Sequence, residues 1–167
     1  MGIGYSGHKH QKGEKTLEIC DNLGNIIAPL VIHPVNHHDS VLFNESFFGF
    51  METADLLELD LTRTCLTLDS GFDSEANRVT IRGQGLLPVI HPNPRGTKNQ
   101  EKITQAWEAF EPYRDIYKER YKIERSFAWE DTYRRVVIRY ERLQSTHMGF
   151  KYLAYSMINL RWCMGKT

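Results

Sequence analysis

The chain has 167 residues, of which 21 are basic and 21 acidic, so its formal net charge is zero. With 41% hydrophobic residues it can bury one sizeable core, and we expect a single domain over residues 1–167. No apolar run approaches the ~20 residues that span a bilayer, and the start lacks the apolar segment of a signal peptide, which excludes a membrane partner and favours a soluble, cytoplasmic protein.

The cysteines exclude two further classes of protein. Cys20, Cys65 and Cys163 are widely spaced and form no Cys-x-x-Cys pair. Neither a disulfide framework nor a zinc ribbon is indicated, and a reducing cytosol fits best.

Charge is unevenly distributed along the chain. Residues 39–75 hold nine acidic side chains and one basic one, whereas residues 113–167 hold twelve basic and six acidic ones. One interpretation is that both are ordinary solvated faces. The other is that the chain gathers carboxylates on one feature and presents a basic helical surface to a polyanion such as a nucleic acid.

The first predicted element is a hairpin. Residues 16–20 have the composition of a short strand, and residues 21–25 carry the Asp, Asn and Gly that form turns. Residues 26–35 are apolar and rich in β-branched side chains. The two apolar segments should therefore pair across the turn.

A long helical pattern follows and runs to residue 59. Asp39 or Ser40 is a natural N-cap for it, because a side-chain oxygen there can accept a backbone N–H of the first turn. His37 and His38 precede the helix without a partner at metal-site spacing, so we interpret them as loop residues rather than ligands.

The middle of the chain alternates strands and helices. Residues 64–68 and 86–90 are predicted strands, and a short helix over 74–82 lies between them, capped by Asp73 or Ser74. Asp69 directly follows the first of these strands, at the end where α/β sheets place functional groups. Gly71 turns the backbone away, so Asp69 can present its carboxylate openly.

The remainder is predicted to be helical. A helix over 98–110 ends before Pro112, and a second helix covers 117–129. In that second helix Tyr117, Arg120 and Glu124 share a stripe beside apolar residues that should face a core, so Glu124 is expected to point inward. Its partner would be Arg120 or a metal ion; the alternative is an ordinary Arg–Glu helix pair at the surface.

The last helix carries apolar residues at 3.6-residue spacing, which predicts core packing. These residues are Phe150, Leu153, Ala154, Met157, Leu160 and Met164.

Asp69 and Glu124 are hard oxygen donors suited to Mg²⁺ or Mn²⁺, which use few protein carboxylates and complete their shell with water and phosphate oxygens. Two such ions about 3.5–4 Å apart could activate a water or a 3′-hydroxyl and stabilise the leaving oxygen of a phosphodiester. Such a site needs neither a protein nucleophile nor an organic cofactor.

Several segments, in order over nearly the whole chain, resemble a known family. They are residues 68–74, 88–95 and 117–129, the last with the pattern Tyr117-x2-Arg120-x3-Glu124-Arg125-Ser126-Phe127-Ala128-Trp129, followed by Arg134-Arg135 and Arg139-Tyr140-Glu141. Together they resemble the catalytic half of DDE transposases of bacterial insertion sequences, most closely the insertion sequence five type.

The resemblance implies an α/β fold of the ribonuclease H-like kind, with a mixed sheet, flanking helices and an N-terminal truncation. It implies Mg²⁺ or Mn²⁺ dependence and DNA cleavage and strand transfer at element ends, in a bacterial protein associated with the nucleoid. Asp69 is similar to the second catalytic acid and Glu124 to the third. Residues at positions that contact DNA or support the site are Tyr117, Arg120, Arg125, Arg134 and Arg135.

Two departures from the family pattern matter. The position seven residues after Glu124, where the family usually has Lys, is Asp131, so phosphate binding would fall to Arg125, Arg134 or Arg135. The first catalytic Asp should lie on a strand before residue 16, where nothing acidic precedes Glu14. Asp21 is a poor substitute because it lies in a turn. We therefore expect a C-terminal piece whose first Asp is encoded upstream, with double-stranded DNA and either a second copy or a separate N-terminal part as partners.

Two alternatives remain open. One is a single-strand transposase using His8, His10 and a Tyr117 nucleophile, although Lys9 occupies the position between the histidines that should be apolar. The other is a remnant that binds DNA or a partner subunit without chemistry.

Overall fold

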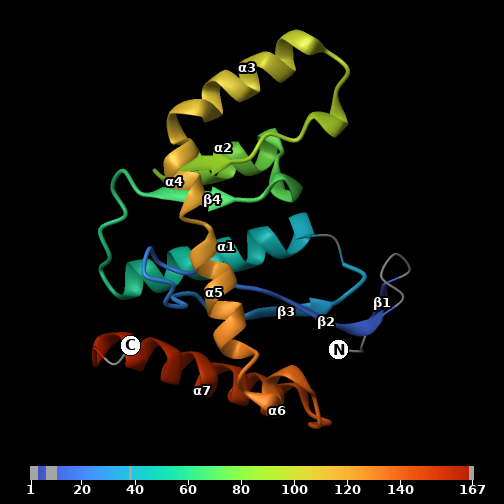
Figure 1. Cartoon of the computed structure of the whole chain (residues 1–167), viewed down its shortest axis with the longest axis vertical. Helices are drawn as coiled ribbons and strands as arrows, with labels where there is room; N and C mark the ends of the chain where they lie inside the picture. The colour runs from blue at the N-terminus through green and yellow to red at the C-terminus, as the bar shows by residue number, and fades with distance from the viewer. Residues whose placement is uncertain (1–3, 7–10, 38, 166–167) are drawn as a thin grey trace. The chain divides into compact units, whose positions relative to one another are not determined.

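A computed structural model describes residues 4–6, 11–37 and 39–165 (Figure 1). The strands are β1 (Gly4–Ser6), β2 (Gln11–Leu17), β3 (Val31–Pro34), β4 (Cys65–Leu68) and β5 (Leu87–Ile90). The α-helices are α1 (Asp39–Leu56), α2 (Glu75–Gly83), α3 (Gln100–Phe110), α4 (Arg114–Lys118), α5 (Tyr121–Glu130), α6 (Arg134–Val137) and α7 (Gln144–Cys163). Three short 3₁₀ helices are η1 (Ser70–Phe72), η2 (Pro94–Gly96) and η3 (Glu111–Tyr113). The predicted order of strands and helices is confirmed.

The described strands form two sheets. Strands β1, β2 and β3 are antiparallel in that order, with Thr16 opposite Ile32, and β4 and β5 form a parallel pair with Leu68 opposite Ile90. The family resemblance implies a mixed sheet, whereas the described strands are divided between an antiparallel and a parallel sheet. The fold class, α/β, is confirmed.

The chain divides into two compact units. Unit 1 comprises residues 1–53 and 121–167, and unit 2 comprises residues 54–120. Consequently β1–β3, α5, α6 and α7 belong to unit 1, whereas β4, β5 and the helices α2, α3 and α4 belong to unit 2.

The predicted hairpin is present in unit 1, but its first strand is β2 (Gln11–Leu17) rather than residues 16–20, and its second strand is the shorter β3 (Val31–Pro34). Strand β2 pairs with β3, and an isolated bridge joins Cys20 to Ile26. In the connecting turn the Asp21 carboxylate accepts hydrogen bonds from the backbone N–H groups of Leu23 and Asn25, which explains why Asp is found there. His37 lies in the turn after β3, as predicted, and the side chains of His38, Asp39 and Ser40 lie outside the described residues, as do His8, Lys9 and His10.

Unit 1 has two buried apolar groups. Helix α1 contributes Leu42, Phe43, Phe47 and Phe50, which are at most 3% exposed. The hairpin and α7 contribute Ile26, Leu30, Tyr155 and Ile158. In unit 2 the large buried hydrophobic side chains include those of Phe72, Ile81, Leu86, Val89, Ile90 and Phe110.

The predicted continuous helix over 117–129 is wrong. Helix α4 ends at Lys118, Glu119 and Arg120 form a turn, and α5 begins at Tyr121. Tyr117, Arg120 and Glu124 therefore do not share one helical stripe. Nothing in the local sequence marks this break, because Lys, Glu and Arg are good helix formers.

The predicted core face of the last helix is also wrong in part. Of the six predicted core residues only Ala154 is buried, and Leu153, Met157, Leu160 and Met164 are 44–61% exposed. The buried face of α7 instead carries His147, Lys151, Ala154, Tyr155 and Ile158. This buried face is partly polar, whereas the predicted one is apolar. It can be buried because Lys151 is paired with Glu18 and Glu130 in the interior. No helix in the described ranges is sufficiently long and apolar to cross a membrane.

Candidate functional site

Asp69 lies where the sequence predicts it, directly after the last residue of β4. Because β4 and β5 are parallel, their carboxyl ends meet at one edge, and the loops after both strands lie there. Asp69 is exposed, and its Oδ1 accepts a hydrogen bond from the Gly71 N–H at 2.8 Å, at the start of η1. The carboxylate is therefore oriented by its own loop and open to solvent.

The loop that carries Asp69 is held by Asp73. Asp73 Oδ1 accepts from Arg78 Nη2 at 2.7 Å, and Oδ2 accepts from the Asn93 N–H at 2.7 Å. Asn93 in turn donates its side-chain amide to the Ser70 carbonyl at 3.1 Å. The loops after β4 and β5 are thereby tied together by a half-buried ion pair and backbone hydrogen bonds, which fixes the backbone around Asp69.

Tyr117 lies in an aromatic cluster of unit 2. Its ring centroid is 5.5 Å from that of His91, which follows β5, and 5.2 Å from that of Phe110, and Trp107 contacts both of these residues. The guanidinium of Arg120 lies 5.9 Å from the Tyr117 ring centroid. The two predicted DNA-binding residues thus remain neighbours although the helix between them is broken.

Glu124 does not point inward as predicted. It is exposed in the first turn of α5, and the buried positions of this helix are Ser126 and Glu130. Ile123 packs against the unit 1 core, whereas Phe127 is 39% exposed. The break before Tyr121 changes which face of the helix is covered, and the acid that faces the interior is Glu130.

Arg125 is bound to the turn at residues 21–25. Its guanidinium lies 4.9 Å from the ring centroids of both Trp129 and Trp162 and donates to the Leu23 carbonyl. The Ser126 hydroxyl donates to the Gly24 carbonyl. Gly24 has φ +88°, and a Cβ there would lie 3.1 Å from Arg125 Nη2, so the close approach of the turn to α5 requires glycine.

Asp21, the alternative candidate for the first catalytic acid, uses both carboxylate oxygens for hydrogen bonds within this turn. Its Oδ1 accepts from two backbone N–H groups, and its Oδ2 accepts from the Asn25 side-chain amide at 2.9 Å. These bonds give the carboxylate a structural role at the turn.

Arg134 and Arg135 begin α6, and both are exposed. Arg135 lies 3.5 Å from Glu141 and over the Phe150 ring. Asp131, at the position where the resembling family usually has Lys, is exposed as well.

A buried charged cluster in unit 1 joins the end of α5 to α7. Lys151 Nζ is 2.6 Å from Glu130 Oε1 and 3.3 Å from Glu18 Oε1, and the Tyr155 hydroxyl contacts Oε2 of both glutamates. Burial raises the pKa of the Glu18 carboxyl, and burial together with the Glu18 charge raises the pKa of Tyr155. We call these four residues the Glu18 cluster.

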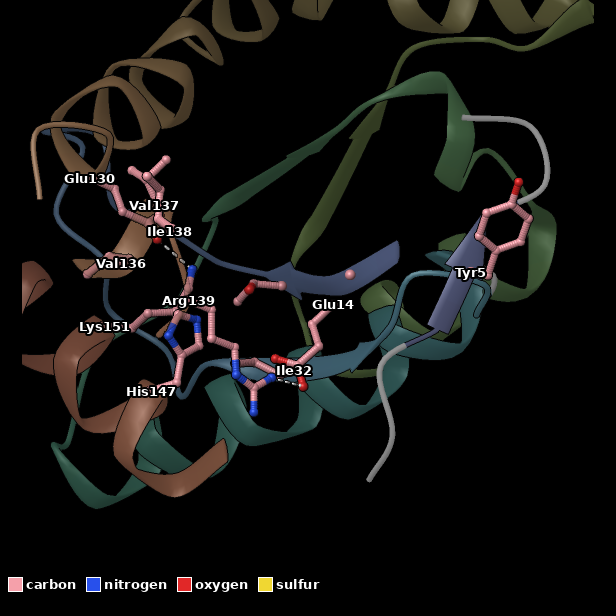
Figure 2. A pocket seen from close by; sticks show the side chains of 12 residues that line it. Tyr5, Glu14, Ile32, Glu130, Val136, Val137, Ile138, Arg139, His147 and Lys151 are labelled. Atoms are coloured by element: carbon pink, nitrogen blue, oxygen red, sulfur yellow. Dashed lines mark ion pairs between the residues drawn. The ribbon is translucent and has the colours of Figure 1, made fainter. Parts of the chain in front are cut away.

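A hollow of about 810 Å³ opens beside this cluster, and Figure 2 shows the side chains around it. Its polar lining includes two ion pairs, Glu14–Arg139 at 2.5 Å and Glu130–Lys151. His147 is buried there, and within the described part of the chain its Nδ1 has no hydrogen-bond partner. Burial, followed by the charges of Arg139 and Lys151, lowers the pKa of His147.

The family model described as the transposase DDE domain matches residues 2–157. The chain belongs to this family. The match covers both units, including the edge that carries Asp69 and the helix that carries Glu124. No curated protein and no solved structure matches the chain.

As a transposase DDE domain the chain has DNA as its expected substrate, and the family generally uses divalent metal ions. The chemistry of Asp69 and Glu124 suits such ions, since both are exposed carboxylates. Within the described residues, no three side chains of His, Cys, Asp or Glu are gathered as a metal site. Sequence reasoning gave Asp73 only a role as a helix cap and gave no role to Arg78, Asn93 or the Glu18 cluster. For the cluster, the sequence signal was Lys151, which lies on the same helical stripe as Ala154 and Ile158.

Proposed function

We propose that this chain is the C-terminal portion of the catalytic domain of an insertion-sequence transposase of the insertion sequence five type. It cleaves DNA at the element ends and transfers the strands, with Mg²⁺ or Mn²⁺ bound by Asp69 and Glu124. The observation that supports this most is the presentation of Asp69, an exposed carboxylate at the carboxyl edge of a parallel strand pair, on a loop held by the Asp73–Arg78 ion pair.

When bound, the metal ions would activate the attacking oxygen and stabilise the leaving oxygen of the phosphodiester. The protein's own contribution is placement. Asp69 supplies an oxygen whose direction is set by the Gly71 N–H, and Glu124 supplies one from the first turn of α5, where the positive end of the helix dipole favours a carboxylate.

DNA contacts are assigned to residues of both units. Arg134 and Arg135 are exposed and suited to phosphate, and Tyr117 with Arg120 offers an aromatic face beside a cation. Arg125 is the least suited of the five predicted contacts, because its guanidinium already lies against two indole rings and a carbonyl.

We propose further that the first catalytic Asp comes from another segment, either encoded upstream or supplied by a partner chain. The bonds that Asp21 makes within its own turn support this. Bringing two element ends together would also require a dimer. The family match favours this DDE chemistry over a Tyr117 nucleophile, whose histidines His8 and His10 lie outside the described residues.

The test is nicking of supercoiled plasmid DNA in Mg²⁺ or Mn²⁺, with and without the protein segment encoded upstream. We expect feeble nicking by the chain alone and a large increase on completion, which Asp69→Asn and Glu124→Gln abolish. Asp60→Asn is the matched control, because Asp60 is an exposed Asp that accepts from the N–H two residues on, as Asp69 does. If the chain alone cleaves as well as the completed protein, the proposal of a missing acid is wrong.

A second candidate function is a remnant that binds DNA or another subunit without chemistry. It is favoured by the structural use of Asp21, which leaves two candidate acids for a three-acid site. This function predicts salt-dependent DNA binding that Arg134→Ala and Arg135→Ala weaken, together with no cleavage even after completion. A Tyr117→Phe variant tests the nucleophile alternative, since that mechanism requires a covalent DNA adduct that the variant would lose.

A further inference from the structure

The Glu18 cluster brings two carboxylates, one ammonium and one phenol into the interior of unit 1. Glu18 directly follows β2, Glu130 is the last residue of α5, and Lys151 and Tyr155 lie one turn apart on α7. The side chain of Glu18 is 1% exposed, that of Glu130 12% and that of Lys151 10%. Two ionised carboxylates with a single cation would leave an uncompensated negative charge in a medium that solvates it poorly.

The number of available hydrogens also indicates that the two glutamates are not both ionised. The Tyr155 oxygen contacts Oε2 of Glu18 and Oε2 of Glu130. A phenol has one hydrogen and can donate to one carboxylate only, so the second contact requires a hydrogen from a carboxyl group. One of the two glutamates must therefore be protonated if both contacts are hydrogen bonds.

The geometry distinguishes the two glutamates. Lys151 Nζ is 2.6 Å from Glu130 but 3.3 Å from Glu18, so Glu130 is the closer counter-ion of the ammonium. Glu18 is also the more deeply buried of the two, and burial disfavours the ionised form. The other charged groups near the cluster are Glu14 and Arg139, which form an ion pair at the adjoining hollow (Figure 2). Together with Glu141 they also act electrostatically on His147, which lines the same hollow.

We propose that Glu18 carries a proton in the folded protein and that Glu18, Glu130, Lys151 and Tyr155 form a neutral cluster that positions helix α5. In this arrangement Glu18 donates its hydroxyl hydrogen to the Tyr155 oxygen, Tyr155 donates to Glu130, and the Glu130 carboxylate pairs with Lys151. The cluster joins the first hairpin, the end of α5 and the middle of α7. Glu130 and Glu18 are thus positioning residues for α5, the helix whose first turn carries Glu124. The importance of that position for catalysis rests on the proposed function, whereas the protonation of Glu18 does not.

The proposal predicts the direction in which stability changes with pH. A carboxyl whose native pKa is raised above the unfolded value, 4.5, binds a proton in the folded chain that the unfolded chain has released. Its contribution to stability is complete below the unfolded pKa and is lost as the pH rises through the native pKa. Between these two values, the folding equilibrium constant of the wild type should fall tenfold per pH unit relative to a variant that cannot ionise at position 18.

The experiment compares Glu18→Gln with Glu130→Gln in the whole chain, by denaturant unfolding at several pH values. Glutamine supplies an N–H donor in place of the O–H donor that the proposal assigns to position 18, so Glu18→Gln should be as stable as the wild type or more stable, increasingly so as the pH rises. Glu130→Gln removes the counter-ion of Lys151 and should lower stability at every pH. Glu75→Gln, in an exposed pair with Arg82, is the control and should leave stability unchanged.

A spectroscopic measurement reports the proton directly. The side-chain carboxyl ¹³C shift of Glu18 at pH 7 should have the value of a protonated carboxyl, while that of Glu130 has the ionised value. Equal destabilisation by the two Gln variants, or an ionised shift for Glu18 at pH 7, would overturn the proposal. Because neither readout uses DNA or metal, this failure is distinguishable from a failure of the transposase function.

Discussion

The loop after β4 and the Glu18 cluster use their carboxylates in opposite ways. After β4, Asp73 and Arg78 form a half-buried pair that holds a loop, and the neighbouring Asp69 is left exposed. In unit 1, Glu130 and Lys151 form a buried pair, and the neighbouring Glu18 is enclosed with them. The first arrangement suits a carboxylate that must bind a ligand from solvent, and the second suits one that holds elements together.

The largest expected effect comes from breaking the buried pair. Lys151→Met removes the only cation in contact with Glu18 and Glu130 in the described structure, leaving a buried carboxylate uncompensated, and should lower the free energy of unfolding by about 3–5 kcal/mol. Denaturant unfolding measures it. Arg82→Met, which breaks the exposed pair with Glu75 at 3.4 Å, should cost less than about 1 kcal/mol. Similar losses of unfolding free energy in the two variants would show that the buried and the exposed ion pairs contribute equally to stability, which would contradict the comparison.

An intermediate effect is expected where the first hairpin turn meets α5. Gly24→Ala places a Cβ 3.1 Å from Arg125 Nη2 on a backbone with φ +88°, and should destabilise by roughly 2–3 kcal/mol. Gly85→Ala is matched in conformation, with φ +79°, but has open space around it and should cost only about 1 kcal/mol. The difference between the two unfolding free energies isolates the contact with Arg125. Equal unfolding free energies for the two variants would mean that the close approach of the turn to Arg125 has no energetic effect.

A smaller effect separates the two aspartates of the β4 loop. Asp73→Asn weakens the bonds to Arg78 and the Asn93 N–H and should cost about 1–2 kcal/mol of stability. Asp69→Asn changes an exposed carboxylate with one local hydrogen bond and should cost less than about 0.5 kcal/mol. Thermal unfolding of both variants checks this order. The reverse order would make Asp69 the structural residue and Asp73 the candidate ligand.

Local signals were sufficient to predict most of the elements. The turn composition at residues 21–25, a helix N-cap at Asp73 or Ser74 and the short apolar runs of β4 and β5 are each determined within a few residues. The structure confirms these local predictions, with Ser74 as the cap. The position of Asp69 after a strand follows from the same reasoning, because where a strand ends is a local property.

Long-range partners could not be predicted in this way. Glu18 and Lys151 are 133 residues apart in the chain, and nothing near either residue indicates the other. The break between α4 and α5 has no Gly or Pro to mark it, so the expected stripe through Tyr117, Arg120 and Glu124 failed. On α7 the apolar residues at helical spacing lie on the exposed face because the charged cluster occupies the buried one.

The most direct test of the account is whether Asp69 and Glu124 bind the same metal ions. Mn²⁺ titrated into the ¹⁵N-labelled chain broadens amide signals near its binding site. The account predicts that signals of residues 69–71 and 123–125 broaden over the same Mn²⁺ concentrations, and that Asp69→Asn suppresses both sets while Asp60→Asn suppresses neither. Broadening around Glu124 that persists unchanged in Asp69→Asn would show two unrelated sites and contradict the account.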